Sequence, residues 1–142
     1  MKSIFRAYSI FVLALLFSLL LAACEPADWD VILAPPEPVT GLSATSPAVN
    51  DITFNFTLPE FSEQVALFPD YTIMVYYYSR PAGGGKETYH GNLWYGPANF
   101  GNAQSETVTI DTLSSGNYIF ILYTVDNEYQ KSEPTESNSV SW

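Results

Sequence analysis

Residues 51–58 read Asp-Ile-Thr-Phe-Asn-Phe-Thr-Leu, and this stretch decides the fold class because polar and apolar residues alternate along it without a break. Successive side chains of a β-strand point to opposite faces, so all four apolar side chains share one face and the polar ones share the other. Val108 and Ile110 repeat the alternation between threonines and an aspartate. The pattern predicts strands with one buried face.

The rest of the chain after residue 39 continues in the same way. Runs rich in Val, Ile, Thr, Tyr and Phe are separated by Gly, Pro, Asn, Asp and Ser, which is typical of strands and turns. No helical pattern of ten or more residues interrupts them. The predicted strands are 39–45, 51–58, 71–79, 87–95, 106–111, 117–126 and 137–142. Seven short strands within one domain favour an all-β sandwich.

Several segments follow one another in a familiar order. Residues 38–44 read PVTGLSA, residues 71–75 read YTIMV, and residues 107–113 (TVTIDTL) are followed by YIFIL at 118–122. Together with Ser-Glu-Pro at 132–134 before a final strand, they resemble the fibronectin type III family. The resemblance implies an immunoglobulin-like β-sandwich over residues 39–142, in which Tyr118 is a corner tyrosine with a structural role.

Three features depart from that family. Phe54 and Phe56 stand in the second strand, where the family usually has a core tryptophan, and the connection over 113–118 is one residue short. Residues 80–104 are longer and more aromatic than the usual connection, so we treat them as an insertion. These departures leave a related immunoglobulin-like sandwich as the alternative.

The first 23 residues carry an export pattern. Lys2 and Arg6 precede an apolar run over residues 10–21, and no acidic residue occurs there. A basic start and a short apolar run are typical of a secretory signal peptide. A membrane-spanning helix needs about 20 apolar residues, and this run is shorter. A short uncleaved anchor is the alternative.

The apolar run ends in Leu-Ala-Ala-Cys at residues 21–24, which resembles the lipobox of bacterial lipoproteins. In that family the cysteine receives a diacylglyceryl group, residues before it are removed, and acyl chains such as palmitate hold the protein to a membrane. The resemblance implies lipidation of Cys24 and a location in the cell envelope, on the periplasmic side or at the cell surface; ordinary secretion is the alternative. Cys24 is the only cysteine, so no disulfide or thiolate metal site is expected.

Composition after residue 24 excludes one class of partner. Three basic residues stand against 15 acidic ones, which gives the mature chain a net charge of −12. A chain with this negative charge repels nucleic acid, so we expect no nucleic-acid function. Residues 24–38 contain four prolines and four acidic residues and are predicted to be a tether, with an apolar patch at 28–33.

No motif in the sequence indicates catalysis. His90 is the only histidine, and it lies in Tyr-His-Gly-Asn without a neighbouring nucleophile motif. The nearest carboxylate pairs, Asp126 with Glu128 and Glu133 with Glu136, lie in polar segments where a solvated rim is expected. The first pair could also offer oxygens to calcium, but the spacing is unlike an EF-hand. We therefore predict no catalytic residue, no metal site and no cofactor.

An aromatic sheet face is the main functional signal. Alternation places Met74, Tyr76 and Tyr78 on the outer side of one strand, and Ile119, Ile121, Tyr123 and Val125 on the outer side of another. The outer face of a sandwich is normally polar, so either the insertion at 80–104 covers this face or a partner binds it. The predicted contacts are Tyr76, Tyr78, Trp94, Tyr95 and Tyr123.

These observations predict a lipid-anchored, non-enzymatic module that binds protein or glycan at a cell envelope. The alternative is a structural envelope lipoprotein that acts as a spacer or assembly component. An enzyme accessory or small hydrolase is the third hypothesis.

Overall fold

A computed structural model describes residues 34–142 of the chain. The predicted signal peptide, Cys24 and the tether up to residue 33 lie outside the described residues. Within the described part, no helix is long and apolar enough to cross a membrane.

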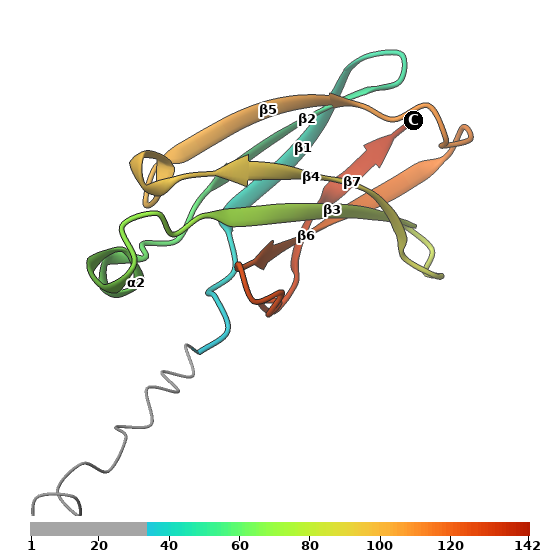
Figure 1. Cartoon of the computed structure of the whole chain (residues 1–142). Coiled ribbons are helices and arrows are strands. Elements are labelled where there is room, and N and C mark those ends of the chain that lie inside the picture. The colour runs from blue at the N-terminus through green and yellow to red at the C-terminus, as the bar shows by residue number, and fades with distance from the viewer. Residues whose placement is uncertain (1–33) are drawn as a thin grey trace, which may run out of the picture. The chain divides into compact units, whose positions relative to one another are not determined.

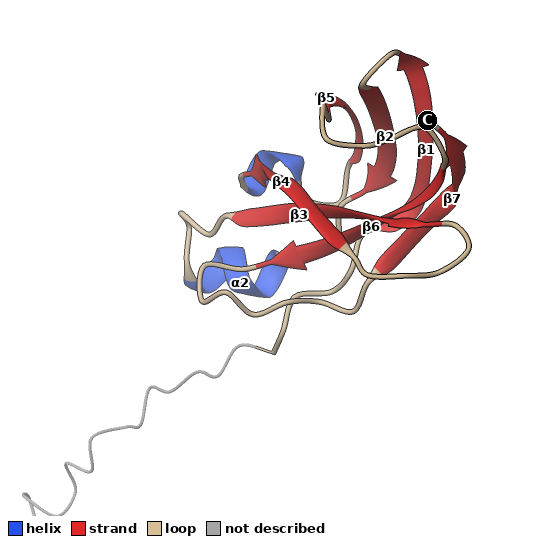
Figure 2. Ribbon diagram, turned by 90° about the vertical axis from the view of Figure 1, so that its right-hand side faces the viewer, coloured by secondary structure: helices blue, strands red, loops and turns tan. Residues whose placement is uncertain are grey.

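Seven strands form two antiparallel sheets that pack face to face (Figures 1 and 2). The three-stranded sheet has the order β1-β2-β5, with β1 at Thr40–Ala48, β2 at Asp51–Thr57 and β5 at Ala103–Thr109. The four-stranded sheet has the order β4-β3-β6-β7, with β4 at Thr88–Tyr95, β3 at Ile73–Pro81, β6 at Asn117–Val125 and β7 at Thr135–Ser141. The predicted all-β sandwich of seven strands is confirmed, whereas the relation to the fibronectin type III family stays a prediction.

Strand ends differ from the predicted ones where a pairing partner extends a strand. β5 begins at Ala103, three residues before the predicted start, because Ala103 pairs with Thr57 at the end of β2. β1 continues to Ala48, which pairs with Asp51 across the turn. Pairing over distance, not local composition, therefore sets these ends.

The core lies between the two sheets and contains the apolar face predicted from residues 51–58. Ile52 and Phe54 are completely buried, and the Phe54 ring lies 5.4 Å from Phe120 and 5.7 Å from Tyr77 of the opposite sheet. Such ring pairs add about 0.5–1.5 kcal/mol beyond their buried area. The alternation in the sequence thus correctly identified the inward face of β2.

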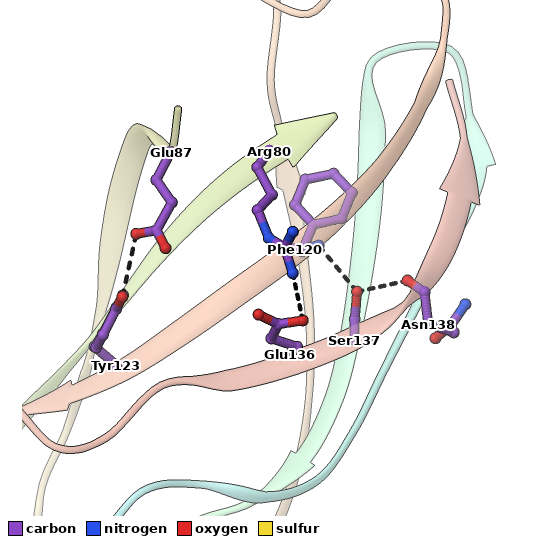
Figure 3. A network of polar contacts seen from close by, with 7 residues as sticks. All are labelled: Arg80, Glu87, Phe120, Tyr123, Glu136, Ser137 and Asn138. Atoms are coloured by element: carbon purple, nitrogen blue, oxygen red, sulfur yellow. Dashed lines mark hydrogen bonds and ion pairs between the residues drawn. The ribbon is translucent and has the colours of Figure 1, made fainter. Parts of the chain in front are cut away.

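Side chains of β7 join the edges of the two sheets. The Asn138 amide accepts a hydrogen bond from Ala44 N (2.9 Å) and donates one to Ala44 O (3.0 Å), in place of a strand partner. The neighbouring Ser137 hydroxyl accepts from Phe120 N at 3.0 Å, where the β6–β7 register shifts (Figure 3). These bonds satisfy backbone groups that the ladders leave open.

Two short helical segments close one end of the sandwich. Helix α2 (Ser62–Leu67) lies between β2 and β3, and the 3-10 turn η1 (Pro97–Asn99) lies between β4 and β5. Their neighbours Phe61 and Phe100 pack with ring centroids 4.8 Å apart. Pro36, within the predicted tether, is buried, so the last tether residues belong to the domain.

Two features of the family resemblance can be located. Residues 80–104 form the end of β3, a hairpin, β4, η1 and the start of β5, so most of this expected insertion lies in the plane of the sheet beside β3. Tyr118 is half-buried at the start of β6, and no hydrogen bond of its hydroxyl is found among residues 34–142.

Candidate functional site

Register brings the outward tyrosines of three strands together. On β3, Tyr76 lies opposite Tyr123 of β6, and Tyr78 lies opposite Tyr89 of β4. Trp94 of β4 stands on the same side, opposite Met74. We call this surface of the four-stranded sheet the aromatic face; it consists of Tyr76, Tyr78, Tyr89, Trp94 and Tyr123.

Four of the rings form one continuous chain. Tyr89 lies 5.5 Å from Tyr76 and 5.2 Å from Tyr78, and Tyr78 lies 5.4 Å from Tyr123, measured between ring centroids. All three pairs are tilted or edge-on, which is the arrangement that the ring quadrupoles favour. The rings therefore hold one another in place before any partner arrives.

Lys131 reaches this chain of rings from the β6–β7 connection, where it forms a bridge with Val125. Its ammonium nitrogen lies 4.7 Å from the centroid of the Tyr78 ring and 4.3 Å from that of Tyr123. It also donates a hydrogen bond of 3.0 Å to the Tyr78 hydroxyl. A cation over two ring faces is attracted by both quadrupoles.

Two polar contacts border the rings (Figure 3). The Tyr123 hydroxyl donates to Glu87 at 3.1 Å, and Arg80 pairs with Glu136 at 2.6 Å. Burial raises the pKa of Tyr123, and the hydrogen bond to Glu87 raises it further. Burial likewise raises the pKa of Tyr89. Both hydroxyls are therefore protonated near neutral pH and can donate hydrogen bonds.

The side chains on this side of the sheet differ in exposure: buried apolar side chains form a floor, and two rings of the aromatic face are prominent above it. Beneath the tyrosines, Met74, Ile121 and Val125 are at most 5% exposed. Trp94 and Tyr89 are 65% and 49% exposed, whereas the other three rings are half-buried. The rings themselves and the side chain of Lys131 cover the apolar floor, while β4 adds the two accessible rings at the edge.

Tyr95, one of the predicted contacts, lies in the core and not on the aromatic face. Tyr95 is 5% exposed, and its ring packs against core Phe56 with centroids 6.1 Å apart. Trp94 and Tyr95 are adjacent in β4 and must point to opposite faces, so only one of them can face outward.

Sequence reasoning missed Tyr89 as a member of the face. Strict alternation of side chains along β4, counted back from Trp94, would place Tyr89 on the inward face of the sheet. The ladder slips between Tyr77 and Tyr78, however, so that Gly91 faces Tyr77 and Tyr89 faces Tyr78. His90 is the extra residue of this β-bulge, and such a residue reverses the alternation beyond it. The Gly91 beside it was the only local signal.

His90 has a partner that the sequence did not reveal. Its Nε2 lies 2.7 Å from the Ser79 hydroxyl, and burial lowers the pKa of the histidine. Ser79 is only 2% exposed, so a substrate could not reach its hydroxyl, and no carboxylate of residues 34–142 bonds to the ring. This part-buried hydrogen bond joins the bulge residue of β4 to β3.

The predicted acidic rim contains a structural aspartate. Asp126 is 1% exposed, and its Oδ1 accepts hydrogen bonds from the backbone N–H groups of Glu128 (2.9 Å) and Gln130 (2.8 Å). It thereby organises the turn between β6 and β7. Within residues 34–142, no three His, Cys, Asp or Glu side chains are grouped to hold a metal ion.

Known proteins show a likeness of fold to this chain but no shared family. No family model matches the chain, and no curated protein matches it. A crystal structure of a family 76 glycoside hydrolase from a bovine Bacteroides thetaiotaomicron strain is similar over 74% of this chain, with a TM-score of 0.46 and 15% identity. The match covers 20% of that structure's chain, and a likeness of this size says nothing about activity.

Proposed function

We propose that the protein is a lipid-anchored, non-enzymatic module of a bacterial cell envelope that binds a protein or a glycan through the aromatic face. The anchor is lipid on Cys24, supported by the basic start, the apolar run and the Leu-Ala-Ala-Cys sequence. Two or three acyl chains would hold such a protein durably to a membrane, on the periplasmic side or at the cell surface.

The observation that carries the binding proposal is the exposure of Trp94 (65%) and Tyr89 (49%) beside three further tyrosines on the outer face of a sandwich sheet. Aromatic side chains are enriched at binding surfaces, because they offer large contact area together with a polar group. Here the tyrosines are already fixed by their neighbours. Little side-chain entropy would be lost on binding, which favours affinity.

A second function, that of a structural spacer or assembly component, is supported by the internal contacts of the same face. Tyr78 contacts two other rings and the ammonium group of Lys131. These contacts stabilise the sheet without any partner. In this alternative, truncation of the rings would lower stability but remove no binding activity.

Hydroxyl-radical footprinting in intact cells and on the purified, lipidated protein separates the two functions. If a partner binds the aromatic face, Trp94 and Tyr89 are labelled in the purified protein and protected in the envelope. Tyr129, which is 75% exposed and outside the aromatic face, serves as the control that stays labelled in both. Equal labelling of Trp94 in both preparations would exclude the binding function and favour the spacer.

The anchor is tested separately. A clickable palmitate analogue should label the wild-type protein in cells, and Cys24→Ala should abolish the label. Continued labelling of Cys24→Ala would contradict lipidation at that residue.

A further inference from the structure

Positive charge is confined to one side of an acidic domain. Residues 34–142 hold 12 of the 15 acidic residues but only three basic ones. All three basic residues belong to the four-stranded sheet or its connections: Arg80 on β3, Lys86 in the β3–β4 hairpin, and Lys131 over the rings of the aromatic face. A partner with negative charge would therefore meet the least repulsion on this side.

Five acidic residues belong to the four-stranded sheet or to the connections between its strands, and four of them are engaged within the domain. Glu136 is the only acidic residue within the four strands, and it pairs with Arg80. Glu87, just before β4, accepts from the Tyr123 hydroxyl. In the β6–β7 connection, Asp126 is buried and accepts from backbone N–H groups, and Glu128 accepts from Gln130. Exposed Glu133 lies two residues after Lys131.

Two of the three cations lack a carboxylate partner. Arg80–Glu136 is the ion pair found among residues 34–142, so neither Lys86 nor Lys131 has a carboxylate oxygen within 4.0 Å in this part of the chain. Lys131 is exposed and uses one of its three N–H donors on the Tyr78 hydroxyl. In a domain with four carboxylates for each cation, this ammonium is held by rings and is open to an external anion.

Besides the anion expected at Lys131, the accessible rings indicate that the ligand contains sugar. Trp94 and Tyr89 project from one strand, with Asn92 on the same side between them. Aromatic faces carry negative partial charge, so they attract the weakly positive C–H groups that line the flat side of a sugar ring. The Tyr89 hydroxyl donates to Asn92 Oδ1 at 3.5 Å, and the Asn92 NH₂ group beside it can donate to a sugar hydroxyl. Bound peptides instead use a free strand edge or a groove, whereas these groups stand on the face of the sheet.

We infer that the aromatic face binds an acidic polysaccharide, with sugar rings stacked on Trp94 and Tyr89 and a ring carboxylate bound by Lys131. This inference rests on the proposed binding function and names the chemical class of its ligand. The carboxylate accepts a hydrogen bond from an N–H group of Lys131 that is not bonded to Tyr78, while Lys86 adds long-range attraction.

Affinity electrophoresis of the full lipidated chain in detergent tests the inference, with polygalacturonate as the acidic probe, dextran as the neutral one and polyglutamate as the acidic peptide. Polygalacturonate should retard the wild-type protein, and dextran and polyglutamate should not. Lys131→Met keeps an unbranched side chain over the rings but removes the charge, so affinity should fall roughly tenfold. Trp94→Ala should weaken binding by a similar factor, and added salt should weaken it in the wild type but less in Lys131→Met.

Controls separate lost contacts from lost folding. Phe68→Ala removes an exposed aromatic ring outside the aromatic face (47% exposed) and should leave retardation unchanged. Circular dichroism melting of each variant checks that the sandwich is intact.

Each contrary outcome has a distinct meaning. Equal retardation by dextran and polygalacturonate, or an unchanged affinity of folded Lys131→Met, would overturn the role of charge and with it the inference. Preference for polyglutamate would replace the saccharide with an acidic peptide. If no probe binds while Trp94 is still protected in intact cells, the saccharide inference fails and the proposed binding function stands; if that protection is also absent, both fail.

Discussion

Substitution of Gly91 tests the placement of β4, and hence the outward direction of Trp94 and Tyr89. Gly91 faces Tyr77 across the β3–β4 ladder, next to the bulge. A Cβ atom added there would lie 2.5 Å from the Tyr77 hydroxyl oxygen and 2.8 Å from Cζ of the same ring. Both distances are far below van der Waals contact, so Gly91→Ala must displace either the ring or the strand.

The ring has little room to move. Tyr77 is 8% exposed, and its centroid lies 5.7 Å from the buried Phe54 ring. Overpacking of a filled core costs about 1–3 kcal/mol, while replacing glycine by alanine in a strand recovers about 0.5–1 kcal/mol of backbone entropy. We expect Gly91→Ala to lower the free energy of unfolding by about 1–2 kcal/mol, and the Tm by roughly 4–8 °C for each kcal/mol.

Urea unfolding of a double-mutant cycle gives the measurement. Tyr77→Leu removes the obstructing ring, so Gly91→Ala should cost far less in that background, with a coupling energy of about 1–2 kcal/mol. Gly96→Ala is the matched control, because Gly96 has an ordinary φ of −99° and no atom within 4 Å of an added Cβ. If Gly91→Ala is as stable as Gly96→Ala in both backgrounds, β4 does not run beside Tyr77 in this register, and the assignment of Tyr89 to the aromatic face loses its basis.

Two further predictions concern parts of the fold that support the aromatic face. Asn138→Ala removes both hydrogen bonds to the backbone of Ala44 and should lower the free energy of unfolding by about 2 kcal/mol. Asn55→Ala, at an exposed strand position, is the control and should change it by less than about 0.5 kcal/mol. Equal effects of the two substitutions in urea unfolding would show that the bonds to Ala44 contribute nothing. Burial lowers the pKa of His90, so below about pH 6.5 the unfolded chain binds the proton first and the free energy of unfolding falls as pH falls. The stability advantage of the wild type over His90→Gln should therefore be smaller at about pH 5 than at about pH 8. An advantage that stays constant or grows on acidification would contradict the partial burial of His90 beside Ser79.

Local alternation accounts for the parts of the core and of the aromatic face that could be predicted before any strand pairing was known. The side chains of a strand alternate because of the backbone alone, so Ile52, Phe54 and Phe56 could be assigned to the core without knowledge of any partner strand. The same rule placed Tyr76, Tyr78 and Tyr123 on one outer face. The predicted export signal and the predicted lipid on Cys24 also depend on sequence alone, because these features are read along the chain and require no folded neighbours.

Which of the aromatic side chains are accessible depends on how the strands pair and pack. The bulge at His90 turned Tyr89 outward, and packing against Phe56 of the other sheet made Tyr95, not Trp94, the inward member of that adjacent pair. Lys131 meets the ring of Tyr78, 53 positions away in the chain, and Asn138 joins Ala44 across 94 positions. Alternation is a property of each strand alone, whereas register, bulges and contacts between distant residues are set by how the strands pack together, which local patterns do not encode.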